Sequence, residues 1–193
     1  LLAPQLAAWA TDDGIAGVIL DSCSDKAFCA GGDVVDLYRS IRSTPAGQVP
    51  ERAAAFFERE YRLDHLIHCY PKPLLAWGHG IVMGGGIGLF AGASHRVVTA
   101  KTRFAMPEIT IGLYPDVGGS WVLQRMPGRS GLFLALTGAP LNASDALFAG
   151  LADFGLQAAG LPALLDDIAS ADWQGEQQAD AARLDHLLAR QAV

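Results

Sequence analysis

The most constraining feature of the sequence is an uncharged stretch of 22 residues, Pro73 to Ser94, in which only His79 could carry a charge. A helix that crosses a membrane needs about 20 such residues, so a membrane span is one interpretation. Seven of the 22 residues are glycine, however, and each glycine inside a helix costs about 1 kcal/mol relative to alanine. We therefore interpret the stretch as two short buried strands, a glycine turn at Gly84–Gly86 and a buried helix, and we expect no membrane partner.

The composition is typical of a globular domain with a substantial core. The 193 residues include 14 Lys plus Arg and 20 Asp plus Glu, a formal net charge of −6, and 51% of them are hydrophobic. Disorder requires low hydrophobicity and high charge, so it is excluded for most of the chain. The acidic balance and the lack of basic runs argue against nucleic acid as a partner. Three cysteines (Cys23, Cys29, Cys69) are too few for a disulfide scaffold and suggest a reducing, cytoplasmic compartment.

Strand-like and helix-like segments alternate along the chain, which predicts an α/β domain. The predicted strands are residues 15–20, 74–77, 80–83, 96–100 and 103–106. The predicted helices are residues 1–10, a segment that begins at Val34, residues 51–70, the segment after the glycine run to about 92, a segment that begins near Val117, residues 130–137, and one capped by Asn142 that ends at Gly150. Residues 107–116 are predicted to form an irregular connector, and residues after about 156 to be helical.

Two glycine turns, Cys29–Asp33 and Met83–Gly86, each lie between a strand-like segment and a helix. Glycine serves tight turns in any protein, and that explanation suffices for either turn alone. Together, two helix N-termini that lack obstructing side chains can each aim a backbone N–H at the same oxygen atom. Such a pair is an oxyanion hole, which stabilises a carbonyl oxygen as it gains negative charge.

Two acids follow prolines in apolar surroundings: Glu108 after Pro107, and Asp116 after Pro115. Each has an ordinary structural explanation, Asp116 as the N-cap of a helix that starts at Val117 and Glu108 as an acid in a first helical turn. A carboxyl pair facing the glycine turns would instead supply acid–base or nucleophilic chemistry.

Glu60 lies on the apolar stripe of the helix predicted for residues 51–70, in register with Phe56, Leu63 and Ile67. A carboxylate on a face that points toward the core must be paired, hydrogen-bonded or neutral. A buried salt bridge is the structural explanation, and a place in an acidic site is the functional one.

Two further motifs are weaker indications of a functional site. Residues 86–91 match the dinucleotide-binding pattern G-x-G-x-x-A, with Glu108 at about the required distance, but Met83 and an extra glycine pair precede the pattern. His65, His68 and Cys69 offer metal ligands one helical turn apart, but a zinc site needs a second convergent pair. We therefore expect neither a dinucleotide cofactor nor a metal.

Five segments together resemble the crotonase (enoyl-CoA hydratase/isomerase) superfamily, and within it the 3-hydroxyisobutyryl-CoA hydrolase branch. The resemblance runs from about residue 15 to 156 in consistent order. The segments are KAFCAGGDV (26–34), FEREY (57–61), HGIVMGGGIGL (79–89), FAMPEITIGLYPDVGGS (104–120) and LALTG (134–138).

The resemblance implies an α/β fold, a crotonase-like spiral of ββα units with a helical C-terminal segment. Residues 1–156 would be the crotonase-like core, without the N-terminal hairpin of the family, and residues 157–193 an incomplete helical segment. It also implies association into trimers or hexamers. Coenzyme A would be part of the substrate rather than a separate cofactor, and the family's basic residues for the CoA phosphates would lie outside this chain.

Carried over by position, the resemblance assigns the oxyanion-hole amides to Gly32 and Gly85. It assigns the acids of the hydrolase branch to Glu108 and Asp116, and it places Glu60 in the acyl pocket. The implied activity is hydrolysis of a short 3-hydroxyacyl-CoA such as 3-hydroxyisobutyryl-CoA, an intermediate of valine catabolism.

Two alternatives within this fold remain open. Hydratases of the superfamily have a second catalytic glutamate just after the glycine run, where this chain has Gly88, which argues against water addition to a double bond. A non-catalytic CoA-binding or scaffold protein would have no need for three acids in apolar settings.

Overall fold

The computed structural model describes residues 1–193. The strands are β1 (Val18–Leu20), β2 (Ala27–Cys29), β3 (Leu74–Gly78), β4 (Ile81–Met83), β5 (His95–Val98), β6 (Arg103–Ala105), β7 (Leu141–Asn142) and β8 (Phe154–Gly155). The α-helices are α1 (Leu2–Ala10), α2 (Val34–Ser43), α3 (Glu51–His68), α4 (Gly85–Ala91), α5 (Gly119–Leu123), α6 (Ser130–Thr137), α7 (Ala143–Phe148), α8 (Leu161–Ser170) and α9 (Gln177–Gln191). The 3-10 helices are η1 (Pro107–Ile111), η2 (Pro127–Arg129) and η3 (Ala158–Gly160).

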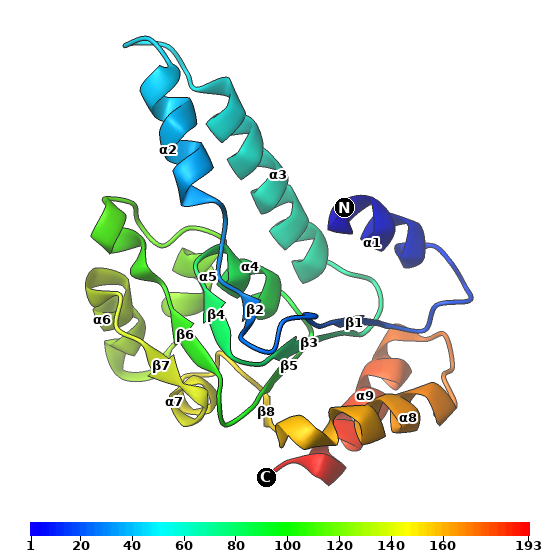
Figure 1. Ribbon diagram of the computed structural model, residues 1–193. Helices are drawn as coiled ribbons and strands as arrows, with labels where there is room; N and C mark the ends of the chain where they lie inside the picture. The colour runs from blue at the N-terminus through cyan, green and yellow to red at the C-terminus, as the bar shows by residue number, and fades with distance from the viewer.

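Consecutive strands alternate between two four-stranded sheets until β6, with the orders β1-β3-β5-β8 and β2-β4-β6-β7. Neighbouring strands are parallel except for β6 and β7, which are antiparallel. Each strand pair is followed by a helix, so the chain winds as a spiral of ββα units (Figure 1). This confirms the α/β class and the spiral that the resemblance implied.

Strand β3 separates two apolar clusters. Its residues are completely buried from Leu74 to Ala76, as expected for a parallel strand covered on both faces. Leu74 and Ala76 face the larger cluster, whereas Leu75 and Trp77 face the smaller one. The alternation follows from the two-residue period of a strand.

The C-terminal helices α8 and α9 pack on the second face of the β1-β3-β5-β8 sheet (Figure 1). Leu164 of α8 and Leu184 and Leu188 of α9 form the smaller cluster with Leu75 and Trp77. Residues after 156 are therefore helical, as predicted, and they complete the burial of β3.

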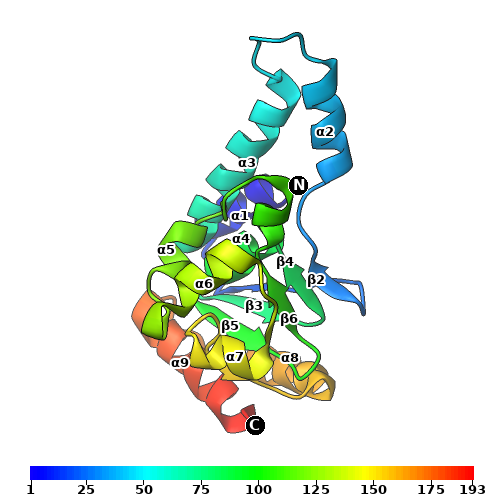
Figure 2. The ribbon, with the colours of Figure 1, turned by 90° about the vertical axis from the view of Figure 1, so that its left-hand side faces the viewer.

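Helices α2 and α3 extend from the body as an antiparallel pair (Figures 1 and 2). The side chain of Asp33 accepts a hydrogen bond from the amide of Asp36 and so caps α2. No residue of α2 is buried, whereas α3 buries Ala53 and Ile67. Ile67 belongs to the larger apolar cluster, and Leu63 and Leu66 pack against it, so the C-terminal half of α3 is fixed against the body.

The uncharged stretch from Pro73 to Ser94 forms β3, β4 and α4, as predicted. None of the helices combines the length and the apolar character needed to span a bilayer. All three cysteines are free thiols.

Several predicted boundaries are wrong by two or three residues. The strand predicted at 15–20 covers only Val18–Leu20, and the helix predicted from Val117 begins at Gly119. The side chain of Asp116 therefore caps no helix, because Gly118 is the N-cap. Strand β2 lies where the glycine turn was predicted to begin and was not predicted. The two-residue strands β7 and β8 were not predicted either, since a two-residue strand has no periodicity to detect.

The predicted cap at Asn142 is confirmed. Its side chain accepts a hydrogen bond from the amide of Asp145, whose carboxylate accepts one from the amide of Asn142, a reciprocal capping box. The helix ends at Phe148, and Gly150 turns the chain with a φ of +73°.

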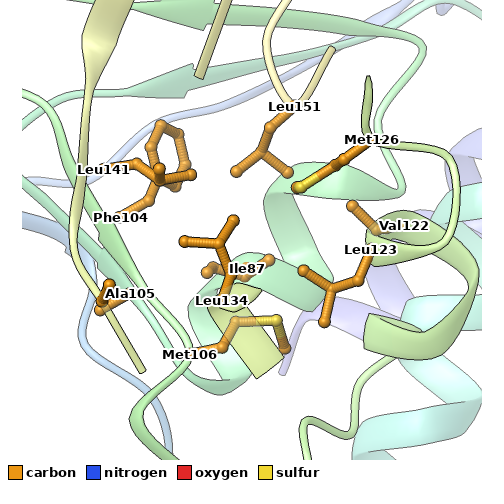
Figure 3. Close-up of a pocket in the computed structure, with 11 residues that line it drawn as sticks. Ile87, Phe104, Ala105, Met106, Val122, Leu123, Met126, Leu134, Leu141 and Leu151 are labelled. Atoms are coloured by element: carbon orange, nitrogen blue, oxygen red, sulfur yellow. The ribbon is translucent and has the colours of Figure 1, made fainter. Parts of the chain in front are cut away.

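A small cavity of about 20 Å³ lies in the core between α4, α5, α6 and β6 (Figure 3). The side chains of Ile87, Phe104 and Leu123 point into it, and all of its lining residues are hydrophobic. No predicted site residue lines this cavity, which is a packing void with space for about one water molecule.

Candidate active site

The two glycine turns are in contact. Gly31 has a φ of +95° and Gly84 a φ of +53°, conformations that side chains disfavour. A β-carbon on Gly31 would lie 3.4 Å from the amide nitrogen of Gly85, and one on Gly85 would lie 3.7 Å from the α-carbon of Gly31. The structure therefore brings together the two corners whose amides were predicted to converge.

The amides of Gly32 and Gly85 have no acceptor in the turns and loops of the protein. Gly85 is the first residue of α4, so its N–H also lacks an acceptor within the helix. A β-carbon on Gly32 would collide with the far end of the Phe56 ring from α3, so a larger residue there would have to displace that ring. Both amides are thus available to a ligand oxygen.

Glu108 and Glu60 lie against these corners. Glu108 is in the first turn of η1 and is only 6% exposed. Its Oε1 lies 3.4 Å from the position of a β-carbon on Gly84, and its Oε2 is buried without a hydrogen-bond partner. The Oε1 of Glu60 occupies the space that a β-carbon on Gly85 would need. The position of Glu60 on the inward-facing side of α3 therefore brings its carboxylate to the corner at Gly85.

Asp116 is 9% exposed and accepts a hydrogen bond from the hydroxyl of Tyr61, at 2.7 Å between Tyr61 Oη and Asp116 Oδ2. The next residue, Val117, has a φ of +44°, which is strained for a β-branched side chain. Backbone strain of this kind is concentrated at functional sites. The connector after Pro115 thus holds Asp116 toward α3.

Charge and burial together raise the proton affinity of these acids. Burial raises the pKa of Glu60 to about 7, with further contributions from the negative charges of Asp116 and Glu108. Burial also raises the pKa of Glu108 above its ordinary value, opposed by a hydrogen bond from its own backbone and assisted by Asp116. Burial and the hydrogen bond to Asp116 raise the pKa of Tyr61. The mutual effects place the three predicted acids in one electrostatic cluster.

Asp64 is a fourth acid of this cluster, and sequence analysis missed it. It lies one helical turn after Glu60 on α3, so the spacing of four residues on the same stripe was the signal that could have revealed it. Both of its carboxylate oxygens are buried and have no hydrogen-bond partner. Burial raises its pKa to about 7, with contributions from the charges of Glu60 and Asp116.

The structure predicts that this cluster destabilises the protein at alkaline pH. The pKa values of Asp64 and Glu60 rise from 3.8 and 4.5 to about 7 on folding, so the folded state binds more protons than the unfolded state between these limits. Stability should fall as pH rises through this window and level off above it. Asp64→Asn should flatten the slope and stabilise the protein at pH 8 by about 1–2 kcal/mol, because residual solvent access weakens the full effect.

Denaturant unfolding from pH 4 to 9 measures this slope. Glu58→Gln is the matched control, since Glu58 is an exposed acid of the same helix that pairs with Arg62. Parallel stability curves for the wild type and Asp64→Asn would contradict the expected proton uptake.

The two weaker motifs do not form the arrangements they suggested. His65 contacts Cys69, with 3.7 Å between Nε2 and Sγ, and the ring of His68 packs edge-on against Trp121. No three His, Cys, Asp or Glu side chains are grouped to hold a metal ion. In the dinucleotide pattern, Gly86 and Gly88 lie within α4 rather than in the turn before it, and a side chain on either would collide with or crowd its neighbours.

The fold and the site define a crotonase-fold protein: two sheets wound from ββα units, with two glycine corners beside buried acids. The family model "Enoyl-CoA hydratase/isomerase" matches residues 1–192, and the chain belongs to this family. The solved structure of a carnitinyl-CoA dehydratase from Mycobacterium thermoresistibile is similar with a TM-score of 0.85 and 40% identity, over 100% of this chain and 52% of that one.

The curated proteins that are similar to this chain include hydrolases and a ribosomal protein. The mitochondrial 3-hydroxyisobutyryl-CoA hydrolase of Xenopus tropicalis is 45% identical over 169 residues, which are 87% of this chain and 42% of the relative. The small ribosomal subunit protein mS47 of Neurospora crassa is 43% identical over 163 residues, which are 84% of this chain and 32% of the relative. The chain thus spans less than half the length of these relatives.

Proposed function

We propose that this chain carries the active site of an acyl-CoA thioester hydrolase that acts on a short 3-hydroxyacyl-CoA such as 3-hydroxyisobutyryl-CoA. The observation that supports it best is the buried Glu108 carboxylate beside two glycine corners whose amides are free. The similarity to relatives named 3-hydroxyisobutyryl-CoA hydrolase supports the choice of substrate class, and valine catabolism is the context that we propose for it.

In this proposal the thioester carbonyl oxygen accepts hydrogen bonds from the amides of Gly32 and Gly85. These donors stabilise the negative charge that develops on the oxygen, and the loss of one such donor typically costs about 3–4 kcal/mol of transition-state stabilisation. They cannot be removed by side-chain substitution, because both are main-chain groups. Substitutions that displace the corners test them instead.

Glu108 supplies the second part of the reaction by one of two routes. As a general base it takes a proton from water, whose oxygen attacks the carbonyl carbon, and it then returns the proton to the departing sulfur of CoA. As a nucleophile it forms a mixed anhydride with the acyl group and releases CoA, and water hydrolyses the anhydride in a second step. A carboxylate with raised proton affinity is a stronger base in the first route and a stronger nucleophile in the second. Asp116, held by Tyr61, orients the substrate hydroxyl or the water, and Glu60 supports that polar end.

Free-thiol detection across a panel of CoA esters tests the proposal. The protein should release CoA from 3-hydroxyisobutyryl-CoA at least 10-fold faster than it hydrates crotonyl-CoA. A preference of that size corresponds to about 1.4 kcal/mol or more of differential transition-state binding. Rapid hydration without thiol release would instead favour a hydratase, and a lack of both activities would favour a structural role.

The structural role is the second candidate function, because one relative is named as a ribosomal protein. Against it, three buried or half-buried acids without a basic partner destabilise the fold at neutral pH and bring it no structural benefit.

We further propose that the protein associates with copies of itself, as expected from the family. Apolar side chains on α6 support this proposal, because Leu132, Phe133 and Leu136 are each more than half exposed. Light scattering of the preparation used for the thiol assay measures the number of copies.

A further inference from the structure

The two oxygens of the Asp116 carboxylate have different environments. Oδ2 accepts a hydrogen bond from the hydroxyl of Tyr61, with 2.7 Å between the two oxygens, a length typical of a charged acceptor. Oδ1 accepts no hydrogen bond from the protein and, in contrast to both oxygens of Asp64, it is not closed off from solvent. One oxygen is therefore held by α3, and the other is free to bind a substrate group or a water molecule.

Helix α3 connects Tyr61 to both glycine corners. The ring of Phe56 occupies the space that a β-carbon on Gly32 would need, and Oε1 of Glu60 does the same at Gly85. Phe56 and Tyr61 are five residues apart, which is about 7.5 Å along the helix axis. Less than two turns of α3 therefore contact both corners and the carboxylate that accepts from Tyr61.

The ring of Tyr61 is supported by aromatic neighbours on the same helix. Its centroid lies 5.8 Å from that of Phe57, one helical turn earlier, at an interplanar angle of 35°. Phe57 in turn packs edge-on against Phe56, with 5.4 Å between the ring centroids. Because aromatic pairs at these distances attract one another, the Tyr61 hydroxyl has a defined position even though the residue is 38% exposed.

The hydrogen bond from Tyr61 counteracts forces that would turn the carboxylate of Asp116. The terminal torsion of an aspartate side chain is broad, so its carboxylate rotates at little cost. The negative charges of Glu60 and Glu108 belong to the same cluster and repel it. The left-handed backbone at Val117 fixes the chain beside the carboxylate but not the side-chain torsion. The orientation of the carboxylate therefore depends on the hydroxyl.

We propose that Tyr61 is a positioning residue of the thioester site, whose hydroxyl fixes the Asp116 carboxylate with Oδ1 presented to the reacting groups. This inference rests on the proposed function and extends it, because it gives α3 the task of orienting an acid that the connector before α5 carries. Tyr61 contacts neither the thioester nor the attacking water, and it acts only through Asp116.

Tyr61→Phe tests the proposal, because it removes the hydroxyl and keeps the ring. For 3-hydroxyisobutyryl-CoA, kcat/KM should fall about 10-fold, the size expected for the loss of one hydrogen bond to a charged group. Tyr38→Phe is the matched control. It makes the same change on an exposed residue of α2 whose hydroxyl forms no hydrogen bond, and kcat/KM should stay at the wild-type value.

The double variant with Asp116→Ala separates positioning from structural damage. When the carboxylate is absent, Tyr61 has nothing to orient, so adding Tyr61→Phe to Asp116→Ala should lower kcat/KM less than about twofold. A loss in this background as large as in the wild type would show that Tyr61 acts by another route and would overturn the proposal. An unchanged kcat/KM in the single Tyr61→Phe variant would overturn it as well.

Crystal structures of the wild type and of Tyr61→Phe give a readout that needs no activity. If the wild type hydrolyses no CoA ester, the proposed function fails, but the structures still measure the orientation of the Asp116 carboxylate. The same comparison decides if turnover by Asp116→Ala is too slow to measure. A carboxylate that turns from its wild-type orientation in Tyr61→Phe supports positioning, and one that stays in place overturns it.

Discussion

Glu108→Gln should abolish thiol release from 3-hydroxyisobutyryl-CoA, with kcat reduced by at least about 100-fold and acyl-CoA affinity changed less than about threefold. Glutamine keeps the shape of the side chain but can neither accept a proton from water nor attack a carbonyl carbon. Glu108 is 6% exposed and its Oε2 has no hydrogen-bond partner, so no hydrogen bond to the protein holds this oxygen away from the substrate.

Stopped-flow thiol detection and equilibrium binding of the same ester measure the two effects separately. Glu58→Gln, an identical change on an exposed residue, is the control and should behave as the wild type. Turnover in the Glu108→Gln variant within tenfold of the wild type would remove Glu108 from the mechanism. After a single turnover in ¹⁸O-labelled water, a labelled oxygen on Glu108 would identify the anhydride route, because water that attacks the Glu108 carbon of the anhydride leaves its oxygen on the protein, whereas the general-base route places it only in the product.

Gly86→Ala should destabilise the protein and remove the activity together. A β-carbon at position 86 would collide with the carbonyl oxygen of Cys29 at the end of β2, which is backbone and cannot rotate away. In an unobstructed helix, alanine would stabilise by about 1 kcal/mol relative to glycine. Here we expect a net destabilisation of about 3 kcal/mol, because α4 must move away from β2.

The same movement would separate the corner at Gly31 from the corner at Gly84, so the two free amides would no longer converge. Denaturant unfolding and thiol release measure both consequences on one variant. Gly160→Ala is the matched control, because its β-carbon would meet only Gln191 Oε1 at 3.5 Å, an ordinary contact, and stability should change by less than about 0.5 kcal/mol. A Gly86→Ala protein as stable and active as the wild type would show that the close contact of α4 with β2 is not needed.

The fold was predictable to the extent that it depends on local sequence. Apolar runs of strand length and glycines between them identified β3, β4 and α4 in a stretch that could also have suggested a membrane helix. The segregation of the strands into two sheets came only from the family resemblance, because strand pairing joins residues such as Val18 and Leu74 that are far apart in the chain.

The candidate site shows the same division. The sequence by itself determined that Glu60 faces inward and that glycine corners precede α2 and α4, since helical period and turn chemistry are local properties. Only the tertiary structure decided that Asp64 loses every hydrogen-bond partner beside Gly88 and that Val117 adopts a left-handed conformation. Burial, strain and the proton affinity of clustered acids depend on which distant segments come into contact, and the pattern of a single segment does not specify those contacts.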